Sequence, residues 1–179
     1  INWIRKHEPD VYALTDKFVQ HQDVILKAFG AENFFTDLPS TSFYGAWDVR
    51  SENWDNSLLE CFDLSPYQFG QPTPSGTQVG IITSVVAEQT GFPAGTLICV
   101  GAWDQTCGVI GMGSTLPGMA TVTLGTAGLA ILVLDKPMTG CGGLFTNHHA
   151  TSEIWQLAGA SITAASSYRW FRDTIGTLE

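Results

Sequence analysis

The stretch LICVGAWDQTCGVIGMG, residues Leu97–Gly113, decides the fold together with MATVTLGTAG at Met119–Gly128, which follows after a short turn. The first stretch predicts a buried strand that brings a single acid, Asp104, to the start of a helix rich in small residues. The second predicts a strand that runs into a glycine turn carrying Thr126. Each pattern places a residue that can do chemistry at the end of a strand.

Strands and helices are predicted to alternate around this region. A strand from Val79 is followed by a helix over Ser84–Thr90 with Gly91 as its cap, and then by a strand over Leu97–Ala102. This βαβ-like alternation favours an α/β fold. The next predicted helix, Gln105–Gly113, carries three glycines, each costing about 1 kcal/mol relative to alanine. So many glycines predict close packing against another element.

The first 80 residues predict shorter elements joined by loops. In chain order these are a helix that starts at Glu8-Pro9-Asp10, a short strand at Lys17–Gln20, a helix at Gln22–Phe29 ended by Gly30, a hairpin around Phe34–Phe35 and Phe43–Tyr44, a helix carrying Trp54, Leu58, Leu59 and Phe62, and an exposed, turn-rich segment at Gln71–Gly80.

The pattern changes after Pro117-Gly118. Three successive strands with glycine-rich turns are predicted at Met119–Leu124, Leu129–Asp135 and Glu153–Ala158, followed by a helix at Ser161–Ile175. A β-β-β-α order after an α/β segment predicts that a second domain begins here. We therefore expect one domain over residues 1–114 and the start of another over residues 115–179.

Composition restricts the classes of function. The chain has 179 residues, of which 44% are hydrophobic and 14% charged, so it can fill a core. A formal charge of −9 with only eight scattered basic residues argues against nucleic acid. No apolar run approaches the roughly 18 residues of a membrane span. The four cysteines show no metal-binding spacing, and we expect them to be reduced and buried, which suits the cytoplasm.

Asp104 is the first candidate for catalysis. Residues 91–134 contain this acid and no other charged side chain. A helix start favours the charged form of a carboxylate, which could then accept a proton from a substrate hydroxyl. The alternative is that Asp104 is a helix N-cap with no further role. Next to it, Gln105 offers the donor and acceptor that polyol recognition needs, and Trp103 could stack on a sugar or pack in the core.

The second candidate is the turn Gly125–Gly128. Glycines let backbone N–H groups approach an anion, and the Thr126 hydroxyl adds a donor, although most such turns are ordinary hairpins. No P-loop or GxGxxG motif accompanies it, so a Walker or Rossmann site is unsupported. The pair His148-His149 lacks a third ligand at a suitable spacing, and we expect a solvated loop and no metal site. A carboxylate with a phosphate-holding turn suits an enzyme that phosphorylates hydroxyls.

Taken in order, these motifs resemble the FGGY family of carbohydrate kinases over essentially the whole chain. The segments that carry the resemblance are FFTDLPSTSFYGAWDVRSENWDNSLLECFDL at Phe34–Leu64, PSGTQVGIITSVVAEQTGFPAGTLICVGAWDQTCGVIGMG at Pro74–Gly113, GMATVTLGTAG at Gly118–Gly128 and WQLAGASITAASSYRWFRD at Trp155–Asp173. Each motif is loose, but the ordered set is specific. The resemblance implies an actin-like ATPase fold of the ribonuclease H-like type, with parts of two α/β domains that enclose a cleft.

The same resemblance implies roles for individual residues. Asp104 matches the catalytic base, which deprotonates the sugar hydroxyl that attacks the γ-phosphate of ATP, and Gln105 matches a sugar contact. The nucleotide side is implied for four positions: Gly125 and Thr126 in a phosphate-binding turn, Ala165 where a helix backbone nears the phosphates, and Arg169 near the ribose. The implied cofactors are ATP and Mg²⁺, with Mg²⁺ bridging the phosphates and contacting few protein ligands.

The chain also departs from the family pattern. Trp103 stands where a small residue, commonly glycine, is usual, which would reshape the sugar pocket. The N-terminal phosphate-binding hairpin, the later glycine-rich signature and the adenosine pocket are missing. We therefore expect an internal piece of a kinase that is inactive alone: residues 1–114 would be the later part of the N-terminal domain, on the sugar side, and residues 115–179 the beginning of the C-terminal domain, on the nucleotide side.

The leading hypothesis is ATP-dependent phosphorylation of a sugar or polyol hydroxyl, with xylulose or a similar ketose as the first candidate. The expected partners are that small molecule and ATP, without nucleic acid or membrane, and a homodimer is compatible with the pattern. A non-catalytic sugar- or nucleotide-binding module of the same fold is the main alternative. An actin-like ATPase acting on a protein is a third, disfavoured by Asp104-Gln105 and by the segment at residues 34–62.

Overall fold

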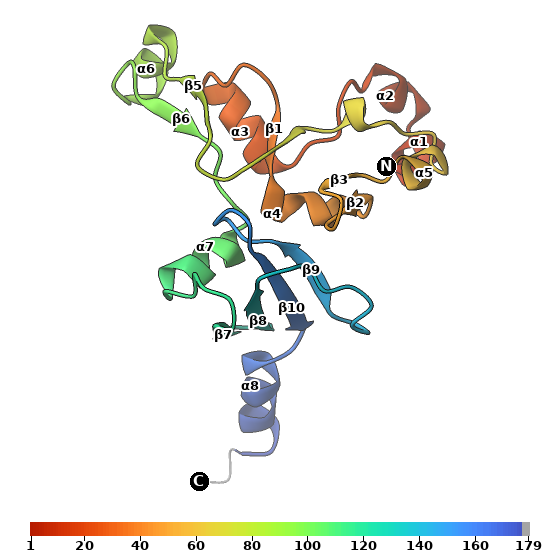
Figure 1. Ribbon diagram of the computed structural model, residues 1–179, viewed down its shortest axis with the longest axis vertical. Helices are drawn as coiled ribbons and strands as arrows, with labels where there is room; N and C mark the ends of the chain where they lie inside the picture. Colours follow the sequence, from red (N-terminus) through yellow and green to blue (C-terminus); the bar gives the residue numbers. More distant parts are fainter. Residues whose placement is uncertain (177–179) are drawn as a thin grey trace. The chain divides into compact units, whose positions relative to one another are not determined.

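The computed structural model describes residues 1–176 and divides the chain into two units. The first unit is Ile1–Trp103, and the second begins at Asp104. Figure 1 labels most of the helices and strands of both. Within residues 1–176, no helix combines the length and the apolar character needed to cross a membrane.

The helix predicted to carry Trp54 and Phe62 is shorter than expected, because it spans Asn56–Glu60 and Trp54 lies in a strand. Two other helices of the first unit end where local signals predict. Gly30 ends one of them with φ +120°, and Gly91 ends another in the left-handed region, as the sequence predicts. The Thr83 side chain caps the last helix by accepting the Val86 amide. These helices are α1 (Asn2–His7), α2 (Pro9–Leu14), α3 (His21–Phe29), α4 (Leu38–Thr41), α5 (Asn56–Glu60) and α6 (Ser84–Thr90), with 3₁₀ turns η1 (Ser42–Tyr44) and η2 (Pro66–Gln68).

The strands of the first unit form three pairs, and here several predictions are wrong. The predicted hairpin at Phe34–Tyr44 does not form, because its first half pairs with a distant strand and its second half is the 3₁₀ turn η1. The segment Gln71–Gly80 is not simply an exposed turn, because strands open and close it. The pairs are β1 (Phe35–Asp37) parallel to β4 (Gln71–Thr73), β2 (Trp47–Asp48) antiparallel to β3 (Asn53–Trp54), and β5 (Gln78–Ile81) antiparallel to β6 (Leu97–Cys99).

The helix α6 therefore connects two antiparallel strands and not the two parallel strands of a βαβ unit. The predicted strand at Lys17–Gln20 is reduced to a bridge between Phe18 and Phe69. Two apolar clusters hold this unit together. The first consists of Ala31, Val79, Ile82, Ile98 and Val100, and the second of Ala46, Trp54, Leu59 and Phe69.

The second unit is built on an antiparallel sheet with strand order β7–β8–β10–β9. The sequence predicts three of its strands and misses the fourth, β9, whose polar residues Thr146 and Asn147 hide its pattern. The helix predicted from Ser161 begins later, because Ser161 is still paired with Gly128 in the sheet. The elements are α7 (Asp104–Gly111), β7 (Ala120–Leu124), β8 (Gly128–Leu134), β9 (Phe145–His148), β10 (Trp155–Ser161) and α8 (Ala165–Thr174).

Two predictions about small residues are wrong. A Cβ added at Gly108 or Gly111 would meet no atom within 4 Å among the described residues outside its own helix and chain neighbours, so these glycines do not mark a close contact. The cysteines are not buried: Cys61, Cys99 and Cys107 are exposed, and Cys141 is half-buried. None of the four forms a disulfide within residues 1–176, and exposure allows their thiols to react.

Gly80 is the glycine that the first unit needs for close approach. A Cβ at this position would lie 2.7 Å from the Gly30 carbonyl oxygen and 3.0 Å from the Cα of Ala31, both backbone atoms that cannot move aside. We expect Gly80→Ala to lower the free energy of unfolding by about 1–3 kcal/mol in urea titrations. Gly101→Ala is the matched control, because its Cβ would meet nothing within 4 Å. Equal stability of the two variants would contradict this packing.

Candidate active site

Asp104 is the first residue of α7, and its carboxylate is exposed. Its Oδ1 accepts the backbone N–H of Gln105 at 2.8 Å, and its Oδ2 lies 3.5 Å from the Gln105 side-chain nitrogen, Nε2. The first turn of the helix thus orients the carboxylate while leaving it open to solvent. An exposed carboxylate with one oxygen already fixed can accept a proton from a hydroxyl that approaches the other.

Trp103, directly before Asp104, is held by both its backbone and its ring. Its N–H donates to Oδ1 of Asp37 at 3.1 Å, across 66 residues of sequence. Its ring meets that of Phe43 edge-on, with centroids 4.9 Å apart and an interplanar angle of 68°. Trp103 is half-buried, so the ring combines a packing contact with a partly accessible surface.

Asp37 is the buried acceptor that joins three segments of the first unit. It is 2% exposed and stands at the point where β1 ends and α4 begins. Oδ1 accepts the N–H of Ser40 at 3.0 Å, which caps α4, as well as the N–H of Trp103. Oδ2 accepts from Nε2 of Gln22 at 3.3 Å. Sequence reasoning does not single out Asp37, although Asp-Leu-Pro-Ser is a helix-start signal.

A second buried carboxylate, Asp23, lies in the same polar network. Its Oδ2 accepts the Thr36 hydroxyl at 2.5 Å, the Gln20 N–H at 3.1 Å and the Tyr44 hydroxyl at 3.5 Å. Its Oδ1 has no hydrogen-bond partner in the part of the chain that the structure describes. Burial raises the pKa of Asp23, and the negative charge of Asp37 adds to the rise. Burial likewise raises the pKa of Tyr44 to about 12.

The raised pKa of Asp23 predicts a defined pH dependence of stability. The folded state holds the Asp23 proton more tightly than the unfolded state, whose pKa is near the ordinary 3.8. Its stabilising contribution is therefore complete below that value and is lost as the pH rises through the raised pKa. We expect the free energy of unfolding of the wild type, minus that of Asp23→Asn, to fall as the pH rises from about 4 to about 7. Urea titrations over this range measure it, and a constant or rising difference would contradict it.

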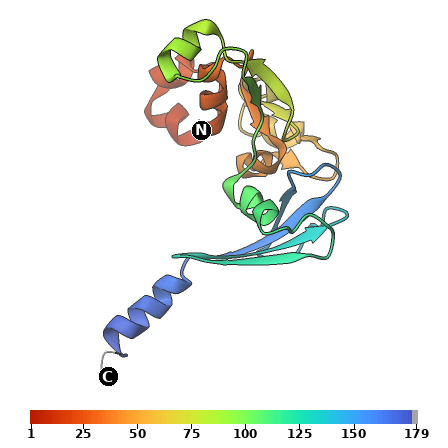
Figure 2. The same ribbon diagram turned by 90° about the vertical axis from the view of Figure 1, so that its left-hand side faces the viewer.

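The turn Gly125–Ala127 joins β7 to β8 in the second unit, and the start of α8 lies against it (Figure 2). The N–H of Ala164 donates to the Thr126 carbonyl at 2.9 Å, and the N–H of Ala165 donates to the Gly125 carbonyl at 3.0 Å. Gly128 permits this approach, since a Cβ there would lie 3.0 Å from the Cβ of Ala164. The structure thus brings together three of the four positions expected to contact the nucleotide.

Few of the hydrogen-bond donors at this turn remain available to a phosphate. The amides of Ala164 and Ala165 are already used by turn carbonyls, and the Ser166 hydroxyl donates to the Thr126 carbonyl at 3.0 Å. The Thr126 hydroxyl is exposed and has no hydrogen-bond partner within residues 1–176. Arg169, the fourth position, is exposed on α8 one turn further along. A phosphate could therefore meet the Thr126 hydroxyl, with the Arg169 guanidinium following on the helix surface.

The structure does not bring Asp104 into contact with Thr126. Helix α7 is attached to the beginning of β10, where Nε2 of Gln156 donates to the Thr106 hydroxyl oxygen. The turn lies at the other end of β10, where Ser161 pairs with Gly128. Ser161 lies five positions after Gln156 in the strand, roughly 17 Å away at the usual rise per residue. The two groups of predicted site residues thus occupy opposite ends of one strand.

The histidine pair is buried, which corrects the prediction of a solvated loop. His148 ends β9 at 5% exposure, and His149 is 4% exposed. Nδ1 of His149 accepts the Thr151 N–H at 2.9 Å, so Nε2 carries the proton and donates to the Ser114 carbonyl at 3.2 Å. Burial lowers the pKa of His149, which favours this neutral form. Its role is to tie the end of β9 to the segment after α7.

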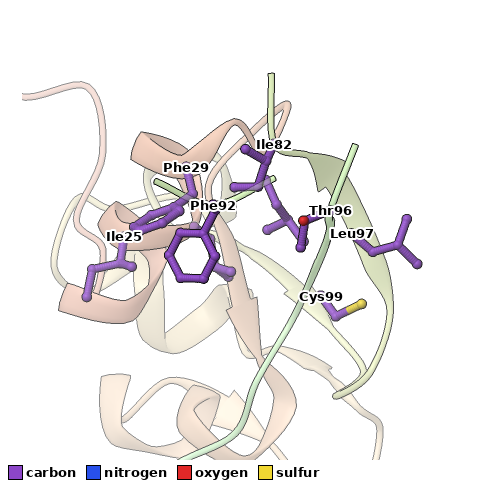
Figure 3. Close-up of a pocket in the computed structure, with 9 residues that line it drawn as sticks. Ile25, Phe29, Ile82, Phe92, Thr96, Leu97 and Cys99 are labelled. Carbon is purple, nitrogen blue, oxygen red and sulfur yellow. The ribbon is translucent and has the colours of Figure 1, made fainter. Parts of the chain in front are cut away.

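An apolar cavity of about 260 Å³ in the first unit holds none of the predicted site residues. Figure 3 shows Phe29 and Phe92 on one side of it and Ile82, Leu97 and Cys99 around the remainder. A lining with so few polar groups does not suit a sugar or a phosphate, which need hydrogen-bond partners. The cavity is therefore separate from the candidate site.

Comparison with known proteins decides the family. Residues 1–111 match the model of the FGGY family of carbohydrate kinases, N-terminal domain. The chain belongs to this family. Like other FGGY proteins it has an actin-like ATPase fold: it superposes with a TM-score of 0.88 on a xylulose kinase from Brucella ovis (23% identity, 97% of this chain, 36% of that one) and 0.87 on one from Rhodospirillum rubrum (22% identity, 99% and 36%).

Curated relatives of this FGGY chain include the autoinducer-2 kinases of Yersinia enterocolitica and Salmonella typhimurium. They are 27% and 28% identical over 172 residues, which is 96% of this chain and 32% of each relative. The chain thus spans about a third of the length of the curated relatives it matches. The expectation of an FGGY relationship and of an actin-like fold is confirmed.

Proposed function

We propose that this FGGY chain forms part of an ATP-dependent kinase that phosphorylates a hydroxyl of a sugar or polyol, and that Asp104 is its catalytic base. The observation that carries the proposal is the exposed Asp104 carboxylate at the first residue of α7, with one oxygen fixed by the Gln105 amide. It is the one charged side chain within residues 91–134. Membership in a family of carbohydrate kinases supports the reaction class.

In this reaction Oδ2 of Asp104 accepts the proton of the substrate hydroxyl while the hydroxyl oxygen attacks the γ-phosphorus of ATP. A new O–P bond forms, the bond between the γ-phosphorus and the β,γ-bridging oxygen breaks, and ADP leaves. The side-chain amide of Gln105, a half-buried residue next to Asp104, can both donate hydrogen bonds to sugar hydroxyls and accept them. The accessible part of the Trp103 ring would form a wall of the sugar pocket. Positioning of the two substrates supplies most of the catalysis.

The second unit would bind the nucleotide. The Thr126 hydroxyl would donate to a phosphate oxygen, the Gly125 turn would allow the phosphates to approach the backbone near Ala165, and Arg169 would reach toward the ribose. Among the residues that the structure describes, no three His, Cys, Asp or Glu side chains converge as a metal site. Mg²⁺ would be held mainly by the ATP phosphates and would neutralise the charge that develops on them.

The two units would contribute to different domains of the kinase. Residues 1–114 would be the later part of the N-terminal domain and residues 115–179 the beginning of the C-terminal domain, on the sugar and nucleotide sides respectively. The end of the family match at residue 111 supports this division. The chain would be an internal part of a longer protein, in keeping with the third of its relatives that it spans.

The acceptor would be a ketose, with xylulose tested first. A second candidate is autoinducer-2, because the curated relatives are named as its kinases. Trp103 affects which of these substrates fits, because its ring would narrow the sugar pocket. A screen of ketopentoses, polyols, aldonates and autoinducer-2 against the full-length kinase separates these substrates. We expect the cytoplasm as the site of action and small molecules as the partners.

The base assignment predicts that Asp104→Asn abolishes turnover while ATP still binds. Asparagine keeps the shape of the side chain but cannot accept the proton, so kcat is expected to fall by on the order of 10²- to 10⁴-fold. Steady-state kinetics and calorimetric ATP binding on the full-length kinase measure the two effects. Asp135→Asn, which also removes an exposed negative charge in the second unit, is the matched control and should leave kcat unchanged.

Near-normal turnover in Asp104→Asn would remove this residue from the base role. Sugar or ATP binding by the unmodified full-length protein without any turnover would favour a non-catalytic binding module of the same fold. The 179-residue chain by itself is expected to show no turnover, because it spans only a third of its relatives.

A further inference from the structure

We propose that Gln156 is a positioning residue for Asp104 and acts through Thr106. The inference rests on the proposed role of Asp104 as the catalytic base. Thr106 lies two residues after Asp104 in α7, and Gln156 is the second residue of β10, 50 residues away in sequence. Nε2 of Gln156 donates to Oγ1 of Thr106, and both residues are completely buried. This contact attaches the base-bearing end of α7 to the sheet.

Helix α7 has few other features that would fix its orientation. It has eight residues, and two of them, Gly108 and Gly111, carry no side chain that could pack. Its buried residues are Thr106 and Val109, which lie three positions apart on one face. An apolar contact such as that of Val109 is not directional, whereas a hydrogen bond is. The bond to Gln156 therefore sets how the first turn of the helix is rotated and how far along the sheet it lies.

The Asp104 carboxylate moves with that first turn. Its Oδ1 is bonded to the Gln105 amide, so a rotation or shift of the turn displaces both carboxylate oxygens. Displacement of a catalytic group by about 1 Å can lower a rate by two orders of magnitude. The contact between Thr106 and Gln156 thus acts on catalysis without touching the substrate.

Gln156 also makes the folded state less stable than an apolar residue at the same position would. Its side chain lies in the sheet core, and its Oε1 has no hydrogen-bond partner among residues 1–176. A buried amide with an unpaired carbonyl is less favourable than an apolar side chain of similar size. A purely structural role would favour leucine at this position. Stability and catalysis are therefore expected to respond in opposite directions when the pair is made apolar.

The test uses the full-length kinase with Gln156→Leu, Thr106→Val and the double variant. We expect kcat to fall on the order of ten- to a hundredfold in each single variant, with smaller changes in KM. The double variant should lose no more activity than either single variant, because the two residues act as a unit. Its unfolding midpoint should equal or exceed that of the wild type, because both partners are then apolar.

Two controls separate positioning from general damage. Thr106→Ser keeps the hydroxyl and should restore kcat to near the wild-type value. Thr121→Val makes the same change at another buried threonine of the second unit, in β7, and it should leave kcat unchanged. Thr106→Val is nearly isosteric with the wild type, so it tests the contact even where Gln156→Leu does not fold.

Asp104→Asn in the same assay keeps the two proposals apart. Turnover in that variant would overturn the proposed base, whatever Gln156 does. An inactive Asp104→Asn variant together with wild-type kcat in Thr106→Val and in the double variant would overturn the positioning role and leave the base in place. Additive losses in kcat would show that Gln156 does not act through Thr106, and would also overturn it.

Discussion

The hydrogen bond from the Trp103 amide to the Asp37 carboxylate fixes the position of the last residues of the first unit. It joins the corner between β1 and α4 to the chain that leaves β6, across 66 residues of sequence. The same buried carboxylate accepts from the Ser40 amide and from Gln22. Loss of this acceptor removes the hydrogen bonds of the Ser40 and Trp103 amides, which is costly in free energy. This contact fixes Trp103, the last residue of the first unit.

The sequence predicts those elements whose signals are local. Helix α6, with Gly91 beyond its end, follows from neighbouring residues alone, and so does the end of α3 at Gly30. Pairings between distant segments carry no such signal. The parallel pairing of β1 with β4 and the burial of His149 depend on residues far away in sequence, so local patterns predict a hairpin and a solvated loop there, and both predictions are wrong. Register and burial of this kind are set by tertiary contacts and not by propensity.

In the candidate site, too, the sequence indicates what depends on local signals and misses what depends on tertiary contacts. Taken alone, Asp104 is more typical of a helix cap than of a catalytic base, and the order of the family motifs is what favours the base. The structure adds how the flanking residues are held: Asp37 accepts the Trp103 amide within the first unit, and Gln156 donates to Thr106 within the second. Neither partner is evident from the sequence, because a buried aspartate or glutamine looks like a surface residue there. The structure also places Ala165 against the turn that carries Gly125 and Thr126, and their contact with a nucleotide stays a prediction.

The most direct test of this account is the hydrogen-exchange rate of the Trp103 amide, measured by NMR on the 179-residue chain. An amide bonded to a buried carboxylate exchanges only when that part of the structure opens. We expect the Trp103 amide to be protected to a degree close to that of the core amides of the first unit, and to lose this protection in Asp37→Ala. Exchange of the wild-type Trp103 amide at the rate of an unstructured chain would contradict the account.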